Sequence, residues 1–242
     1  MVDDATWYVT ICFLKVKHEA SQQIKNYLAY LQVCSVAMHV IHVDRRTEFI
    51  NKDLQTWCQA KGMEIQLTAS YSPSQNGMVE CMNHTLVELA CTMITASKLP
   101  EFLWEQAVAH AAYVQNRAYT IAVSRRTPFQ GWNGKRPNVS HLHEFSTLVW
   151  ILLQGQNVTQ KILPKSKHHA YVGYENASKS VLYYNAKTKK VLTSHNYTFF
   201  MARKPTLQED IVIENPLACE GEREGTNTCT VEENLPKPAK TS

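Results

Sequence analysis

The sequence has no long hydrophobic run. Among its 242 residues, no apolar segment approaches the roughly 18 to 20 residues that a membrane-spanning helix needs. The first residues, MVDDATWYV, also lack the basic stretch followed by a hydrophobic one that is typical of a secretory signal. We therefore expect a protein that is not secreted, spans no membrane, and acts in the nucleus or the cytoplasm.

Paired cysteine motifs are absent as well. The seven cysteines are scattered, odd in number and never spaced as C-x-x-C, so the sequence indicates neither a disulfide framework nor a zinc ribbon. The ten histidines include close pairs, but no cysteines stand at finger-like spacing from them. We expect reduced thiols and no metal site built from histidine and cysteine.

Charge is distributed unevenly along the chain. Residues 1–206 carry 22 Lys and Arg against 13 Asp and Glu, whereas residues 207–242 carry 3 against 8. A basic body fits a polyanionic partner, because Lys and Arg that neutralise phosphates supply the sequence-independent part of nucleic-acid affinity. Ordinary solubility charge explains the same numbers, so composition leaves both interpretations open.

The first part of the chain alternates strand-like and helix-like patterns. Strands are predicted at 7–16, 38–43 and 63–68, and helices at 19–33 and 50–61. This β–α–β–α–β order predicts an α/β layer architecture.

Two longer helices follow a loop. Residues 69–77 are dense in turn formers. Behind them, apolar residues at steps of three or four predict a long helix that leaves Glu80, Asn83 and His84 on or near its other face. A second helix is predicted at 101–117. Three aromatic residues are expected in the core: Trp104, Tyr113 and Trp132.

The last part changes to short strands. After a turn at 131–138, strands are predicted at 148–153, 169–175, 181–186 and 190–200. Spacing of this kind predicts a small β-barrel or meander, in which three lysines, Lys187, Lys189 and Lys190, occupy an exposed hairpin tip or contact nucleic acid.

Five separated blocks stand out by the order of their residues: DRRTEF (44–49), TASYSPSQNGMVECMNHTL (68–86), LPEFLWEQAVAHAAYVQNR (99–117), TPFQGWNGKRPNVSHLHEF (127–145) and HHAYVGYENASKSVLYYNAKTKKVL (168–192). In matching order and with compatible spacing, they resemble copia-type LTR retrotransposon integrases, over about residues 2–200. The resemblance implies an RNase H-like integrase core, a mixed sheet flanked by helices, followed by the small all-β barrel typical of these Pol polyproteins.

The resemblance also implies a reaction and its ligands. Family integrases join DNA by strand transfer with two divalent metal ions, Mg²⁺ or Mn²⁺, held by an Asp, a second Asp and a Glu 35 residues later. Asp44 matches the second Asp and Glu80 the Glu, and 35 residues separate them. Paired cations stabilise the charge that builds on attacking and leaving oxygens, and Mg²⁺ prefers carboxylate ligands. Alone, Asp44 is an ordinary turn carboxylate and Glu80 an ordinary surface residue.

Further residues match positions that imply nucleic-acid contact. Gln75, Asn76 and Gly77 match the family's loop before the catalytic helix, and Asn83 and His84 lie on that helix. A simple turn is the plainer interpretation of the loop. The implied partners are DNA, both element ends and target, with RNA as an alternative, and a further copy in a homo-oligomer.

The sequence departs from the family in ways that bear on catalysis. The first catalytic Asp has no counterpart, so we expect an amino-terminally truncated core whose first strand is missing. Arg45, Arg46 and Thr47 replace the flexible Asn-Gly-Gly of the family, and Cys81, Met82 and His84 take places that are usually basic. Two carboxylates are expected to bind two metal ions weakly. Strand transfer should be impaired; the alternative is a non-catalytic nucleic-acid-binding remnant of a transposable element.

The resemblance also sets the expected domain limits. Residues 1–125 form the truncated integrase-like core, 126–144 a linker and 145–204 the small β-barrel. Residues 205–242 are acidic and poor in large apolar side chains, so a disordered tail is predicted.

Overall fold

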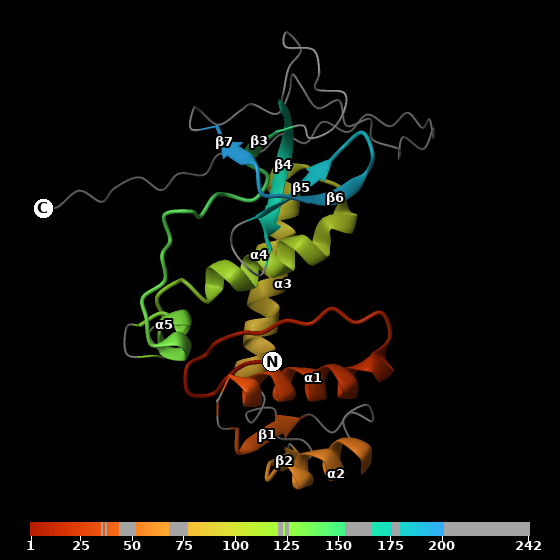
Figure 1. Cartoon of the computed structure of the whole chain (residues 1–242), viewed down its shortest axis with the longest axis vertical. Helices are drawn as coiled ribbons and strands as arrows, with labels where there is room; N and C mark the ends of the chain where they lie inside the picture. Colours follow the sequence, from red (N-terminus) through yellow and green to blue (C-terminus); the bar gives the residue numbers. More distant parts are fainter. Residues whose placement is uncertain are drawn as a thin grey trace, which may run out of the picture. The chain divides into compact units, whose positions relative to one another are not determined.

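The structure is a computed structural model of the whole chain, drawn in Figure 1. Residues Met1–Pro205 form one compact unit. Among the described residues, no helix has the length and apolar character needed to cross a membrane. The description covers residues 1–34, 36, 38–43, 52–67, 77–120, 123, 126–152, 166–175 and 180–200.

The first layer contains two parallel strands and two helices, much as the sequence predicts. A 3₁₀ turn, η1 (Lys17–Glu19), leads into α1 (Ala20–Val33). Strand β1 (Val40–Val43) pairs in parallel with β2 (Glu64–Leu67), and α2 (Lys52–Ala60) connects them. The predicted strands and helices of this region, apart from the strand at 7–16, are confirmed within a few residues.

Apolar stripes on α1 and α2 hold this layer together. Leu28 of α1 packs in a buried cluster with Leu54 and Cys58 of α2, and Met63 before β2 completes it. The buried ammonium group of Lys25 forms an ion pair with Asp53 across the two helices. The sequence periods therefore predict the correct buried faces.

The strand predicted at 7–16 is wrong. Val9 forms only an isolated antiparallel bridge with Val2, and Met1 and Thr10 exchange two backbone hydrogen bonds of 2.9 Å each. Among the described residues, no strand lies beside the following segment, Ile11–Leu14. A β-prone sequence forms a strand only where a neighbouring backbone pairs with it.

A side chain replaces the neighbouring strand at Val9. The amide of buried Asn116 accepts a hydrogen bond from the Val9 N–H and donates one to the Val9 carbonyl, both at 2.8 Å. The Val9 side chain packs with Met82 and Leu86 in a second buried cluster. Residues 107 positions apart in the chain are thus joined at one point.

Two helices form the centre of the structure. Helix α3 (Gly77–Ser97) packs against α4 (Trp104–Gln115), which η3 (Glu101–Leu103) precedes, and Figure 1 shows the two crossing. Both predicted helices are confirmed. The expectation that Trp104 lies in the core is wrong, because its side chain is 52% exposed. Tyr113 and Trp132 are partly buried.

A short helix replaces the first half of the turn predicted at 131–138. Helix α5 spans Pro128–Asn133. Its cap is the Thr127 hydroxyl, which accepts a hydrogen bond from the Gln130 N–H at 3.0 Å, while Gly134 ends it with a φ of 70°. These are the start and stop signals that such a helix needs.

Five antiparallel strands form the second sheet: β3 (Leu148–Leu152), β4 (Ser166–Tyr174), β5 (Val181–Asn185), β6 (Lys190–Ser194) and β7 (Tyr197–Phe199). Their order is β6-β5-β4-β3-β7, so the predicted strand at 190–200 divides between opposite edges. Since β6 and β7 are adjacent in sequence, the sheet must curl strongly. No pairing closes it into a barrel among the described residues.

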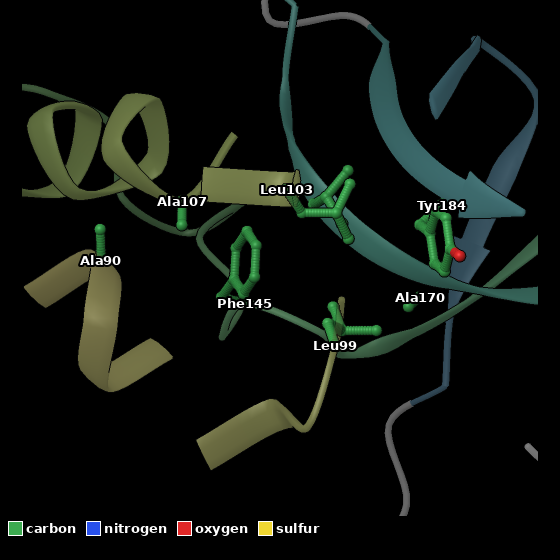
Figure 2. Close-up of a cluster of buried hydrophobic side chains, with 8 residues drawn as sticks. Ala90, Leu99, Leu103, Ala107, Phe145, Ala170 and Tyr184 are labelled. Atoms are coloured by element: carbon green, nitrogen blue, oxygen red, sulfur yellow. The ribbon is translucent and has the colours of Figure 1, made fainter. Parts of the chain in front are cut away.

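One face of this sheet packs on the central helices. Figure 2 shows Phe145 among Leu99, Leu103 and Ala107 of the helical region, with Ala170 and Tyr184 approaching from β4 and β5. Leu103, Ala107 and Val172 are fully buried in this cluster. The proposed core and barrel regions therefore share apolar side chains. The expected domain limits stay a prediction, and residues 201–242 lie outside the described part.

We predict that Asn116→Ala lowers the free energy of unfolding by about 2 to 4 kcal/mol, since it leaves a buried donor and a buried acceptor of Val9 unpaired. Urea unfolding measures the change. Asn133→Ala is the matched control, because this exposed amide donates only to the Phe129 carbonyl at 3.1 Å; its effect should stay within about 0.5 kcal/mol. Equal effects of the two changes would contradict a stabilising role for the hydrogen bonds between Asn116 and Val9.

Burial of His110 should make stability depend on pH. This side chain is 4% exposed, lies against the rings of Phe145 and Tyr171, and leaves Nδ1 without a hydrogen bond among the described residues. Burial lowers the pKa of His110 from 6.5 to about 4. The unfolded chain therefore takes up a proton first as the pH falls, so stability is lost between pH 6.5 and about 4.

Over that interval, we expect His110 to cost about 3 kcal/mol of unfolding free energy. Urea unfolding at pH 7 and pH 4.5 should show a smaller loss for His110→Leu than for the wild type. His195→Leu, at an exposed position, should follow the wild type. An identical pH dependence in all three proteins would show that His110 is not the titrating group.

Candidate metal and nucleic-acid interface

The structure describes only some of the predicted site residues. Glu80, Asn83 and His84 lie on α3, and Gly77 is its first residue. Asp44, Gln75 and Asn76 fall outside the described residues, although β1 ends at Val43, directly before Asp44 in the chain. Whether Asp44 approaches Glu80 therefore remains a prediction.

Helix α3 separates its site candidates from its core contacts. Met82, Leu86 and Ala90 step by four residues along the buried face. Glu80 and His84 repeat at the same interval on the opposite side, and both are exposed. The predicted division of this helix into a buried and a free face is confirmed.

The Glu80 carboxylate makes no hydrogen bond or ion pair within the described part of the chain. Its neighbour one turn later, His84, places Nδ1 3.4 Å from Glu88 Oε2, and both of these side chains are well exposed. An exposed pair at this spacing contributes at most a few tenths of a kcal/mol. The described residues therefore place no partner on this carboxylate.

The donor chemistry of Glu80 fits a hard cation. Carboxylate oxygens are the ligands that Mg²⁺ prefers, and Glu80 presents two of them at the start of a rigid helix. Across the described ranges, no three His, Cys, Asp or Glu side chains group closely enough to hold a metal ion. Any metal site that uses Glu80 thus needs a ligand from elsewhere, and Asp44 is the predicted one.

The exposed face of α3 offers little to phosphate. Between Gly77 and Ser97 the helix contains no Lys or Arg, and its charged side chains are Glu80 and Glu88. Exposed lysines occur instead at the β5–β6 turn, where Asn185 Oδ1 accepts a hydrogen bond from the Lys187 N–H at 3.1 Å. The predicted hairpin tip of Lys187, Lys189 and Lys190 is confirmed as a structural feature.

A cluster around Arg117 lies apart from the residues that the sequence motifs indicate. Its guanidinium carbon lies 3.4 Å from the Tyr113 ring centroid and 4.7 Å from that of Phe129. The Tyr113 hydroxyl is 2.7 Å from His141 Nε2. The only signal for it in the sequence is the four-residue spacing of Tyr113 and Arg117 on one helix.

Burial governs the charge of this cluster. It lowers the pKa of Arg117 and of His141, and for His141 the nearby Arg117 charge lowers the pKa further. The Tyr174 hydroxyl donates a hydrogen bond to the His141 carbonyl, which ties β4 to the segment after α5. We interpret the cluster as a structural anchor between α4 and the second sheet.

Comparison with known proteins bears on the five blocks. The chain is 26% identical over 199 residues to a retrovirus-related Pol polyprotein from transposon TNT 1-94 of Nicotiana tabacum. It is 25% identical over 199 residues to that of transposon RE2 of Arabidopsis thaliana. Each match covers 82% of this chain. Its homologues are retrotransposon Pol polyproteins. The resemblance to copia-type integrases is thereby confirmed.

The match covers a small part of each relative. The chain spans 15% of the tobacco polyprotein and 14% of the Arabidopsis one, and a transposon Ty1 Gag-Pol polyprotein of Saccharomyces cerevisiae matches over 70% of this chain at 24% identity. No protein-family model matches the sequence. The similarity therefore does not show that this chain has the activities of these much longer polyproteins.

Solved integrase structures are also similar to the chain. A simian T-cell lymphotropic virus intasome in complex with a PP2A regulatory subunit contains a chain with a TM-score of 0.46 and 15% identity, covering 84% of this chain and 72% of its own. An HTLV-2 integrase catalytic core domain in complex with magnesium has a TM-score of 0.41 and 18% identity, covering 53% and 79%. Both TM-scores lie below 0.5.

The free face of α3 should tolerate substitution. We predict that Glu80→Gln and His84→Ala each change the free energy of unfolding by less than about 0.5 kcal/mol. Leu86→Ala on the buried face should cost about 2 to 4 kcal/mol, because it leaves a cavity in the core. Urea unfolding of the three variants measures the contrast. A large loss with Glu80→Gln would assign that carboxylate a structural role.

Proposed function

We propose that this chain is an integrase-derived segment that binds DNA and whose strand-transfer activity is impaired. The proposal rests on the similarity to retrotransposon Pol polyproteins and on one observation in the structure. Glu80, in the block that resembles the family's catalytic helix, is exposed at the first turn of α3 and makes no hydrogen bond or ion pair with any residue that the structure describes. Such a carboxylate is free to act as a ligand.

In this proposal, Asp44 and Glu80 together hold a divalent cation, Mg²⁺ or Mn²⁺. When bound, the cation would stabilise negative charge on the oxygens of a phosphodiester. Asp44 follows β1 directly in the sequence, and Glu80 lies in the first turn of α3, so each carboxylate belongs to or adjoins a regular element. The residues themselves supply ligand oxygens and orient them.

The composition of α3 supports weak activity rather than full activity. The exposed face of this helix has no Lys or Arg to hold a phosphate near Glu80. This absence lowers the affinity for DNA beside the carboxylate that would bind the metal.

The absence of Lys and Arg from α3 also favours a second candidate, a non-catalytic nucleic-acid-binding remnant. In that case DNA contacts basic residues remote from α3, such as the lysines of the β5–β6 turn. The two candidates agree on DNA binding and differ only in whether Glu80 matters. A substitution at Glu80 therefore separates them.

We expect the full chain to bind a short DNA duplex with an affinity that falls steeply between about 50 and 200 mM salt. Replacing Lys187, Lys189 and Lys190 together by Gln should reduce the slope of log affinity against log salt by roughly 2 to 3. Fluorescence anisotropy measures both quantities. A salt-independent affinity in the wild type would contradict binding through phosphates.

Strand transfer is tested on a duplex that carries a processed end, with Mg²⁺ or Mn²⁺. We expect faint joining or nicking that Glu80→Gln abolishes, while Glu80→Gln binds DNA as the wild type does. His84→Ala is the matched control on the same helix face. Activity that survives Glu80→Gln would exclude the metal role, and no activity with either cation would leave the non-catalytic candidate.

A further inference from the structure

The segment between α4 and the second sheet carries charge of one sign. Between Glu105 and Glu144 the sequence contains five Lys and Arg and no Asp or Glu. Arg117 is partly buried in the cluster described above, and Arg125 lies outside the described residues. The other three side chains are exposed, and we call them the α5 patch: Arg126, Lys135 and Arg136.

The charge of the α5 patch is not compensated within the described part of the chain. None of its three side chains makes a hydrogen bond or an ion pair with a residue that the structure describes. Asp3, in the amino-terminal hairpin near α5, is already occupied, because its Oδ2 accepts hydrogen bonds from the Thr6 N–H and hydroxyl at 2.8 and 2.6 Å. Uncompensated cations on one surface attract a polyanion.

Helix α5 separates the two ends of the patch. Arg126 directly precedes the N-cap Thr127, and Lys135 directly follows the C-cap Gly134. A helix of this length rises about 9 Å, whereas successive base pairs of a duplex rise about 3.4 Å. The cations at the two ends of α5 therefore match phosphates about three steps apart along DNA.

Close packing holds α5 in place. The Phe129 N–H donates a hydrogen bond of 2.8 Å to the Asn116 carbonyl, which joins α5 to the carboxyl end of α4 (Figure 1). The Trp132 ring stacks on Tyr8 with 5.3 Å between centroids. A Cβ at Gly131 would lie 3.1 Å from the Thr6 side chain, so glycine allows this close approach. A fixed support reduces the entropy that the patch loses when it binds a ligand.

We propose that Arg126, Lys135 and Arg136 bind the phosphate backbone of duplex DNA. This inference rests on the proposed function, DNA binding, and assigns a surface to it. The planar guanidinium group of Arg donates two parallel hydrogen bonds to one phosphate, and Lys adds a point charge. Contacts of this kind position a duplex without selecting its bases.

The side chains of α5 favour DNA over an acidic protein as the partner. A protein partner needs apolar or aromatic anchors near the centre of the contact. Between the two ends of the patch, the apolar side chains of α5 are buried or partly buried: Pro128, Phe129 and Trp132. Asn133, which precedes Lys135 by two residues, is exposed and polar. Phosphate contact needs charge and hydrogen-bond donors, which this surface supplies.

Fluorescence anisotropy of the full chain with a short duplex, between about 50 and 200 mM salt, tests the proposal. A variant that combines Arg126→Gln, Lys135→Gln and Arg136→Gln should reduce the slope of log affinity against log salt by roughly 2 to 3. Its affinity at about 100 mM salt should fall about ten-fold or more. Its unfolding midpoint should not change, because all three side chains are exposed.

A second triple variant is the matched control. Lys17→Gln, Lys61→Gln and Lys98→Gln together remove the same three charges from exposed positions. Each of these lysines has a glutamate within three residues along the chain, unlike the residues of the α5 patch. The control should keep a salt slope within about 1 of the wild type.

Chemical modification of the wild type locates the contact. Acetylation of Lys135, followed by mass spectrometry, should slow several-fold when the duplex is bound, whereas acetylation of Lys61 should not change. Polyglutamate at an equal concentration of charge should displace the labelled duplex far less than unlabelled duplex does.

The outcomes separate this surface from DNA binding in general. If the wild type binds DNA but the α5 patch variant binds equally well, or the control triple variant loses as much, the proposed function stands and this inference is wrong. Unprotected Lys135 would overturn it in the same way. Displacement by polyglutamate as strong as by DNA would assign the patch to an acidic protein. A wild type without salt-dependent DNA binding would contradict the proposed function and this inference together.

Discussion

Two hydrogen bonds between the Asn116 side chain and the Val9 backbone join the ends of the helical region, and much of the remaining arrangement depends on them. The Asn116 side-chain amide sets an N–H donor beside a carbonyl acceptor as a peptide group does, so it pairs with Val9 as a neighbouring strand would. With Val9 held, its side chain fills the space beside Met82 and Leu86. The buried face of α3 is thereby covered, and the free face that carries Glu80 is defined as its opposite.

The two hydrogen bonds of Asn116 also explain where backbone pairing ends in the amino-terminal segment. The Asn116 amide fixes Val9, and the Met1–Thr10 hydrogen bonds fix the hairpin around it. The amide contacts one residue only, so it gives no backbone partner to the residues after Thr10. Among the described residues, Ile11–Leu14 therefore form no strand and make no backbone hydrogen bond.

The helices and most strands follow from sequence periodicity, since the positions of Leu28, Leu54 and Leu86 already mark the buried faces. Two features did not follow. The strand at 7–16 needed a partner that the described part of the chain does not place there, and the exposure of Trp104 depends on what lies opposite it. Both are properties of neighbours distant in sequence, which local patterns do not contain. Periodicity also predicts one half of the candidate site, because it places Glu80 on the exposed face of its helix. The distance from Glu80 to Asp44 depends on the path of the chain between them, which periodicity does not give.

The similarity to Pol polyproteins and the chemistry of helix α3 are separate observations. The homologues account for the order of the five blocks, and the structure adds that the helix carrying Glu80 has kept its buried stripe while its free face has no cation. Met82, Leu86 and Ala90 serve the packing of α3, whereas contact with a phosphate would use the exposed positions between them. The two demands therefore fall on different residues of one helix. In the proposed function, the charge of the exposed face limits phosphate contact however well Glu80 is placed.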